Sequence, residues 1–299
     1  MFAAVLSLSL VTAQGFAAAP ATESPEEYAN RIIQEMNNDD PTLQQLQSQY
    51  GIGETTTKTS YFVTEYTYTN DTTKRTLSEN NIESKVTVFD EYPEAFIHQL
   101  ETQAGTQTIT PGQAVTKDFS VLQVTLSYSK IQYTTSDMYY VKNSFVWTKL
   151  PSPGYTTNIM GVIGLAFNPQ LSIDGASLQG RYYYDRYVAL GSGGGNNLST
   201  AVTFDVPTTT YGMGASFNFT HQKGQGLADY LTAFSGYVGC VAIKSNSDDQ
   251  YCSTLAIYED VSSFGLLSSE VSISFPAGVS FSFGAVHTPY NVQDSLTLR

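Results

Sequence analysis

The sequence predicts an all-β protein, an antiparallel β-sandwich or sandwich-like barrel with a short helical segment at its N-terminus. Three observations support this fold class. Short segments in which apolar and polar residues alternate recur along the chain, and turn residues separate them. Tyrosine, which favours strands, is abundant, with 21 copies in 299 residues. Strands do not alternate with long helices, so β-α-β units and a parallel sheet are not expected.

The predicted strands are recognised by their period of two. In residues 118–133, for example, Leu122 and Val124 alternate with Gln123 and Thr125. Such segments fill one predicted domain, residues 54–299. They are residues 59–69, 84–90, 118–133, 138–150, 159–165, 176–190, 200–206, 211–220, 235–243, 251–259, 270–275 and 279–286.

Residues 22–53 form a different segment, for which we predict two short amphipathic helices. Residues 24–27 read Ser-Pro-Glu-Glu, which is the pattern of a capping box with proline at the first helical position. A second helix is expected to begin at Asp40-Pro41 and to end before Gly51. This segment is expected to dock on the main domain; pairing with a partner and removal as a pro-segment are the alternatives. A single further helix is predicted for residues 92–100.

Residues 1–21 have the layout of a secretory signal peptide. An apolar run from Phe2 to Val11 is followed by small residues, and Ala19 and Ala21 suit cleavage. Lysine and arginine are missing before the apolar run, which departs from the usual pattern. We therefore expect a secreted, extracellular protein.

Composition excludes several classes of partner. The net charge is −13, and only 14% of residues are charged, against about 25% in ordinary soluble domains. Binding of nucleic acid relies on cations that contact phosphates, so no nucleic-acid partner is expected. The most apolar internal run, residues 159–167, is too short for a transmembrane helix and predicts a buried strand. No transmembrane helix is expected in the mature chain.

Cys240 and Cys252 are the only cysteines, and an isolated pair in an exported chain usually bonds. Alternating segments flank a polar tip at residues 245–249. A hairpin centred on Asn246 would place the two cysteines opposite each other, within reach of a disulfide. The sequence therefore predicts a Cys240–Cys252 disulfide that staples a hairpin.

Signatures of catalysis are weak. The three histidines are His98, His221 and His287, and no Gly-x-Ser-x-Gly elbow accompanies them. Glu94, His98 and Glu101 have the spacing of one helical face, but a solvated face is the simpler interpretation than a metal site. We predict no catalytic residue, no bound metal and no cofactor.

A tyrosine-rich strand is the candidate binding surface. Tyr182, Tyr184 and Tyr187 are aromatic residues that suit contacts with a glycan or a protein. Because successive side chains of a strand point to opposite faces, Tyr183 is expected to face away from Tyr182 and Tyr184. A strand covered on both sides is the plainer interpretation of the same residues.

Three functions are compatible with these features. The leading hypothesis is a secreted, non-enzymatic β-sandwich protein that binds or assembles at the cell exterior, with a protein or glycan partner. The first alternative is a β-pore-forming toxin, because residues 270–283 alternate serine with valine, isoleucine and phenylalanine around Pro276-Ala277-Gly278. The second alternative is a secreted hydrolase that acts on a glycan or an ester.

Overall fold

The computed structural model describes residues 23–71, 81–110, 113–150, 159–188, 195–219, 222–224, 227–246, 248–262, 271–274, 278–281 and 286–298. The predicted signal peptide, residues 1–21, lies outside these ranges, as do His221 and two residues of the predicted hairpin turn, Pro276 and Ala277.

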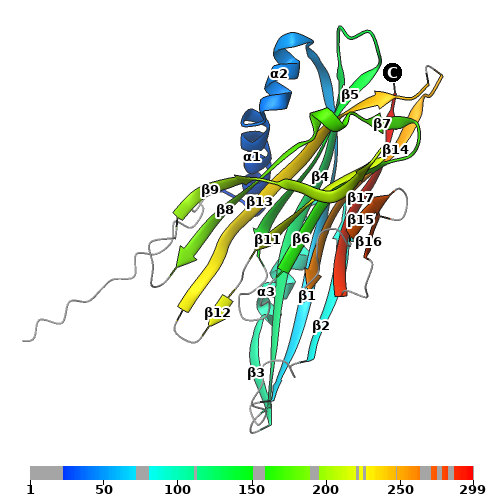
Figure 1. Ribbon diagram of the computed structural model, residues 1–299. Helices are drawn as coiled ribbons and strands as arrows, with labels where there is room; N and C mark the ends of the chain where they lie inside the picture. Colours follow the sequence, from blue (N-terminus) through cyan, green and yellow to red (C-terminus); the bar gives the residue numbers. More distant parts are fainter. Residues whose placement is uncertain are drawn as a thin grey trace, which may run out of the picture.

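The fold is all-β with two main antiparallel sheets, which confirms the predicted class (Figure 1). The larger sheet has ten described strands, seven of them in the order β2-β1-β4-β5-β13-β8-β9, while β3 pairs with β4 and β7 and β12 pair with β13. Its strands are β1 (Ile52–Asp71), β2 (Asn81–Phe89), β3 (Gly105–Thr110), β4 (Gln113–Ile131), β5 (Met138–Lys149), β7 (Leu171–Ile173), β8 (Gln179–Val188), β9 (Gly195–Ala201), β12 (Gln222–Gly224) and β13 (Leu227–Lys244).

The smaller main sheet has five described strands in the order β10-β11-β6-β14-β17. They are β6 (Ile159–Phe167), β10 (Thr203–Thr209), β11 (Gly212–Phe219), β14 (Tyr251–Ser262) and β17 (Val286–Thr297). Two further strands, β15 (Val271–Ser274) and β16 (Gly278–Phe281), pair only with each other in the described part of the chain.

Helices form in the three regions where the sequence predicts them, and the first two begin at the predicted caps. α1 (Pro25–Asn38) begins with the expected capping box: Glu27 N donates to Ser24 Oγ at 3.2 Å, and Ser24 N donates to the Glu27 carboxylate at 2.8 Å. α2 is Pro41–Gln49, and α3 is Glu94–Gln103. A 3₁₀ turn, η2, covers Gly175–Ser177.

The main core lies between the two sheets and is rich in aromatic rings. Phe145 of β5 packs against Tyr258 of β14 with ring centroids 4.5 Å apart. Trp147 Nε1 donates to the Tyr258 hydroxyl at 3.0 Å, so these two buried polar groups, one from each sheet, are hydrogen-bond partners. Asn143, which is fully buried, donates from Nδ2 to carbonyls of β6 and β14. These contacts fix the position of one sheet on the other.

The three helices cover the outer face of the larger sheet, with α1 and α2 along one part of it (Figure 1). Ala29 and Met36 of α1 pack with Val146 and Tyr237 of the sheet, and Leu46 of α2 packs in a neighbouring cluster. The predicted N-terminal helices therefore dock on the β-sheet. Because the sheet is covered on both faces, β5 is buried along most of its length instead of alternating.

A buried polar cluster, the Asp40 cluster, ties the α1–α2 junction to the sheet. Asp40 is fully buried and accepts hydrogen bonds from the Tyr140 hydroxyl at 2.6 Å, from Lys142 Nζ at 3.2 Å and from the Gln179 amide. Lys142 also donates to Asn37 Oδ1 at 2.8 Å and lies 3.9 Å from the centre of the Tyr237 ring. These five residues, together with Asn37, form the cluster.

The predicted Cys240–Cys252 disulfide is wrong. Both cysteines are buried and unbonded. Cys240 pairs with Val141 of β5, whereas Cys252 pairs with Leu296 of β17. The polar tip does not close a hairpin, because the chain crosses there from the larger sheet to the smaller one. Alternation identified two strands correctly but did not identify their partners, and the cysteines entered the shared core instead of facing each other across a turn.

Candidate functional site

The β15–β16 hairpin separates apolar from polar residues across its register. Val271 pairs with Phe281 and Ile273 with Val279, while Ser272 pairs with Ser280. Residues opposite each other share a face of the ribbon, and neighbouring residues lie on alternate faces. In this register the positions of valine, isoleucine and phenylalanine share one face of the ribbon, the apolar face, and the positions of serine and glycine share the other, the serine face.

This hairpin is inserted between two strands that already lie side by side. β14 and β17 are paired up to Ser262 and Val286, and residues 263–285 connect them. β15 contacts β6, β10 and β11, and β16 contacts β14, so the hairpin is packed against the five-stranded sheet. Figure 1 shows it next to β14 and β17. The segment is thus a two-stranded unit attached at adjacent points to the five-stranded sheet.

The predicted binding tyrosines lie on β8, where Tyr182 and Tyr184 share one face of the sheet and Tyr183 lies on the other, as the alternation predicts. Tyr182 and Tyr184 pack on the core between the sheets, with ring centroids 5.7 Å apart. Tyr183 faces the helices, where its hydroxyl donates to Asp39 Oδ2 at 2.8 Å. The side chain of Tyr187 lies outside the described part of the structure. Binding by these tyrosines stays a prediction.

A cleft lies between α1 and the outer face of β8, β9 and β13. It has a volume of about 840 Å³, its open mouth included. The helix contributes residues at positions 28, 32, 35, 36 and 39, which the helical period places on one face. Across the strands, Ser199, Tyr183 and Ser235 pair in one row and form part of the opposite wall. The complete lining is Tyr28, Ile32, Glu35, Met36, Asp39, Tyr183, Tyr184, Asp185, Ser199, Ala233 and Ser235.

Burial in the cleft keeps the hydroxyl groups of Tyr28 and Tyr183 protonated. Burial raises the pKa of Tyr28, and the nearby charge of Asp185 adds to the rise. Burial, followed by the hydrogen bond to Asp39, raises the pKa of Tyr183 well above its ordinary value. Both hydroxyls therefore stay neutral donors at physiological pH. Alternation pointed to tyrosines of β8 but not to Tyr28 and Asp39, because no local pattern links these two residues to a strand more than a hundred residues away.

The candidate metal face of α3 is a solvated helix surface. His98 Nδ1 lies 2.9 Å from Glu101 and Nε2 lies 3.8 Å from Glu94, and all three side chains are exposed. Within the residues that the structure describes, no group of three or more histidine, cysteine, aspartate or glutamate side chains is placed to hold a metal ion.

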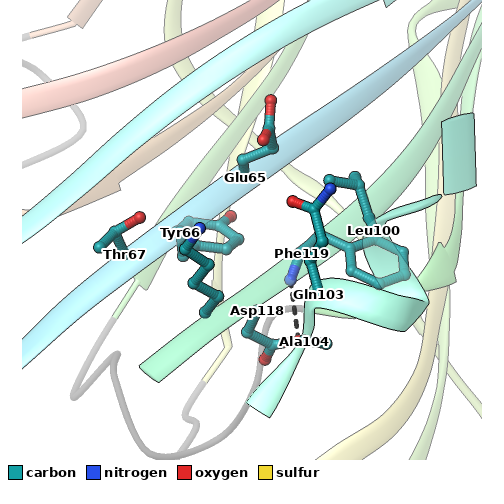
Figure 2. A pocket seen from close by; sticks show the side chains of 9 residues that line it. Glu65, Tyr66, Thr67, Leu100, Gln103, Ala104, Asp118 and Phe119 are labelled. Carbon is teal, nitrogen blue, oxygen red and sulfur yellow. Dashed lines mark hydrogen bonds between the residues drawn. The ribbon is translucent and has the colours of Figure 1, made fainter. Parts of the chain in front are cut away.

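A smaller pocket lies where the end of α3 meets β1 and β4 (Figure 2). Its two carboxylates have lysine partners: Asp118 is 3.3 Å from Lys149, and Glu65 is 3.6 Å from Lys85. In Figure 2 the side chains of Glu65 and Asp118 point away from each other. A glycosidase needs two carboxylates that face the same bond, so this pocket does not present that arrangement.

Among the described residues, no helix combines the length and the apolar character that crossing a membrane requires. The molecule is thus defined as a two-sheet, all-β protein with an inserted amphipathic hairpin. No family profile and no curated protein sequence matches the chain. Among solved structures, it is similar to Clostridium perfringens delta-toxin, with 9% identity and a TM-score of 0.28 over 65% of this chain and 88% of the toxin chain. A likeness at this level assigns no activity to the chain.

Proposed function

We propose that this protein is a secreted, non-enzymatic pore-forming protein whose residues 263–285 insert into a membrane as a β-hairpin. The observation that carries the proposal is the register of β15 and β16, which pairs apolar residues with apolar residues and serine with serine or glycine. A membrane β-strand needs this arrangement, with apolar residues toward lipid and small polar residues toward a water-filled lumen.

The attachment of the hairpin supports the same function. Residues 263–285 suffice for two arms of about ten residues, the length with which a tilted strand spans a bilayer. The arms would extend β14 and β17, which are already paired at Ser262 and Val286. Hairpins from several copies must close into a barrel, because an open sheet edge is not tolerated in lipid. Pore formation therefore requires self-assembly.

Release of a trapped dye tests this proposal. The mature protein is added at submicromolar concentration to phosphatidylcholine vesicles and to intact erythrocytes, and we expect release from at least one of them. Phe281→Lys places a charge on the apolar face near the middle of the second arm, which costs about 2–4 kcal/mol per copy at the bilayer midplane, so release should be lost. Ser280→Lys, one position away on the serine face, should retain it.

Circular dichroism and thermal unfolding establish that both variants fold. Absence of release from both targets, or equal loss of release in the two lysine variants, would contradict the proposal. The leading sequence hypothesis, binding or assembly at the cell exterior without a pore, and the hydrolase alternative both stay predictions. A screen of glycan and ester substrates addresses the second of them.

A further inference from the structure

We propose that the cleft between α1 and strands β8, β9 and β13 binds a carbohydrate that carries no acidic group, that is, a neutral sugar or an amino sugar. This inference goes beyond membrane insertion and does not depend on it, because the cleft and the β15–β16 hairpin share no lining residue.

The walls of the cleft combine the two kinds of surface that a sugar requires. Tyr28, Ile32 and Tyr183 all pack against the cluster of α1 and the sheet, so their positions are fixed by a buried core. Their half-buried side chains offer apolar faces for the C–H surface of a sugar ring. Polar groups stand beside them: Asp39 and Asp185 are acceptors for hydroxyl groups, and Ser199 can donate or accept.

Charge selects against acidic sugars. Three carboxylates line the cleft, those of Glu35, Asp39 and Asp185, and no lysine or arginine is among the lining residues. Guanidinium groups beside the cleft are already engaged: Arg31 lies 2.8 Å from both Glu23 and Glu35, and Arg181 donates to Ser199 at 3.0 Å and lies 4.0 Å from Asp39. A sialylated, sulfated or phosphorylated ligand would bring a like charge into this site, which is unfavourable.

The Asp40 cluster holds the cleft in shape. It anchors the C-terminal end of α1 to β5, because Lys142 Nζ donates to the Met36 carbonyl at 3.3 Å and to Asn37. Met36 and Asp39 thereby keep fixed positions beside Tyr183. A site built on rigid elements loses little entropy when a ligand binds.

Binding of the labelled mature protein to an array of neutral, amino, sialylated and sulfated glycans tests the proposal. We expect binding to neutral or amino glycans only. Asp185→Asn, which keeps the shape of the side chain, should weaken that binding about tenfold, the effect of losing a charged hydrogen-bond acceptor. Tyr183→Ala should weaken it at least as much. Tyr251→Ala removes an exposed tyrosine of β14, outside the cleft, and should leave it unchanged.

Binding confined to acidic glycans, binding to none of the glycans, or binding that survives both cleft substitutions would overturn the inference. Thermal unfolding checks that the variants fold, and Asp185→Asn decides the matter if Tyr183→Ala does not. Dye release from pure phosphatidylcholine vesicles is unaffected by Asp185→Asn if the cleft is independent of the hairpin, so failure of this inference and failure of the pore proposal are distinguishable.

Discussion

At the scale of single residues, Lys142 is a charged group that is costly to bury. Its side chain is almost completely buried on the outer face of β5 beneath the α1–α2 junction. Burial disfavours the charged form and lowers the pKa of Lys142 to about 8, although Asp40 opposes this effect. The N-terminal helices are thus attached through a charge that the fold stabilises less well than water does, and the attachment depends on pH.

Between about pH 8 and 9.5, we expect the free energy of unfolding of the unsubstituted protein to rise relative to that of the Lys142→Met variant. In this window the unfolded state, whose lysine titrates near 10.5, binds more protons than the folded state, so stability increases by up to about 1.4 kcal/mol per pH unit. This added stability is lost as the pH falls through about 8, the pKa of Lys142 in the folded protein. Urea unfolding of both proteins at several pH values measures the difference, and a difference that stays flat or shrinks would contradict the lowered pKa.

At the scale of elements, Asn143 joins the two sheets. Its Nδ2 donates to the Gly164 carbonyl of β6 at 2.9 Å and to the Ile257 carbonyl of β14 at 2.8 Å. These two carbonyls belong to residues that pair with each other in the smaller sheet. One side chain from β5 therefore fixes the position of the larger sheet relative to the smaller one.

Asn143→Ala should lower the free energy of unfolding by about 2–4 kcal/mol, because it removes two buried hydrogen bonds and leaves their acceptors without this donor. Asn291→Ala is the matched control: Asn291 is an exposed asparagine of β17, and its loss should change stability by less than about 0.5 kcal/mol. Chemical denaturation of the two variants gives both values. Equal effects would show that the inter-sheet bonds contribute nothing specific.

Sequence predicted the elements whose signals are local. The capping box and Asp40-Pro41 gave the starts of α1 and α2 correctly, since a cap involves only the first turn. β17 was missed because its polar sequence includes Pro289, which a strand tolerates at an edge, and β17 is an edge strand. β13 begins at Leu227, eight residues before its predicted start at Ser235, where alternation becomes clear.

Pairing between distant segments was not predictable in the same way. Alternation tells which residues share a face but not which strand is the neighbour, so the β13–β14 hairpin was assigned wrongly. The candidate cleft was unpredictable for the same reason, because it forms between segments far apart in the sequence. Tyr28 and Tyr183 line one cleft only because α1 docks on β8, β9 and β13. The hairpin of β15 and β16 was predicted as a candidate because its whole pattern lies within a few residues of one turn.

At the scale of the whole molecule, the core between the sheets contains both thiols. Cys240 comes from the larger sheet and Cys252 from the smaller one, and both belong to the same cluster of buried residues. Burial raises the pKa of Cys252 to about 12 and that of Cys240 further, so neither forms the reactive thiolate at neutral pH. No covalent bond between these cysteines joins the two sheets.

Both thiols should therefore become reactive together, when the two sheets separate. We expect no labelling of the native protein by a thiol reagent, two labelled thiols per chain in denaturant without any reductant, and a labelling transition that coincides with the loss of tertiary structure. A reductant should leave the Tm unchanged, since there is no disulfide to break. Fewer than two labelled thiols in denaturant, or a Tm that falls when a reductant is added, would show that the disulfide exists after all. Labelling of Cys252 before Cys240 would show that the smaller sheet opens by itself.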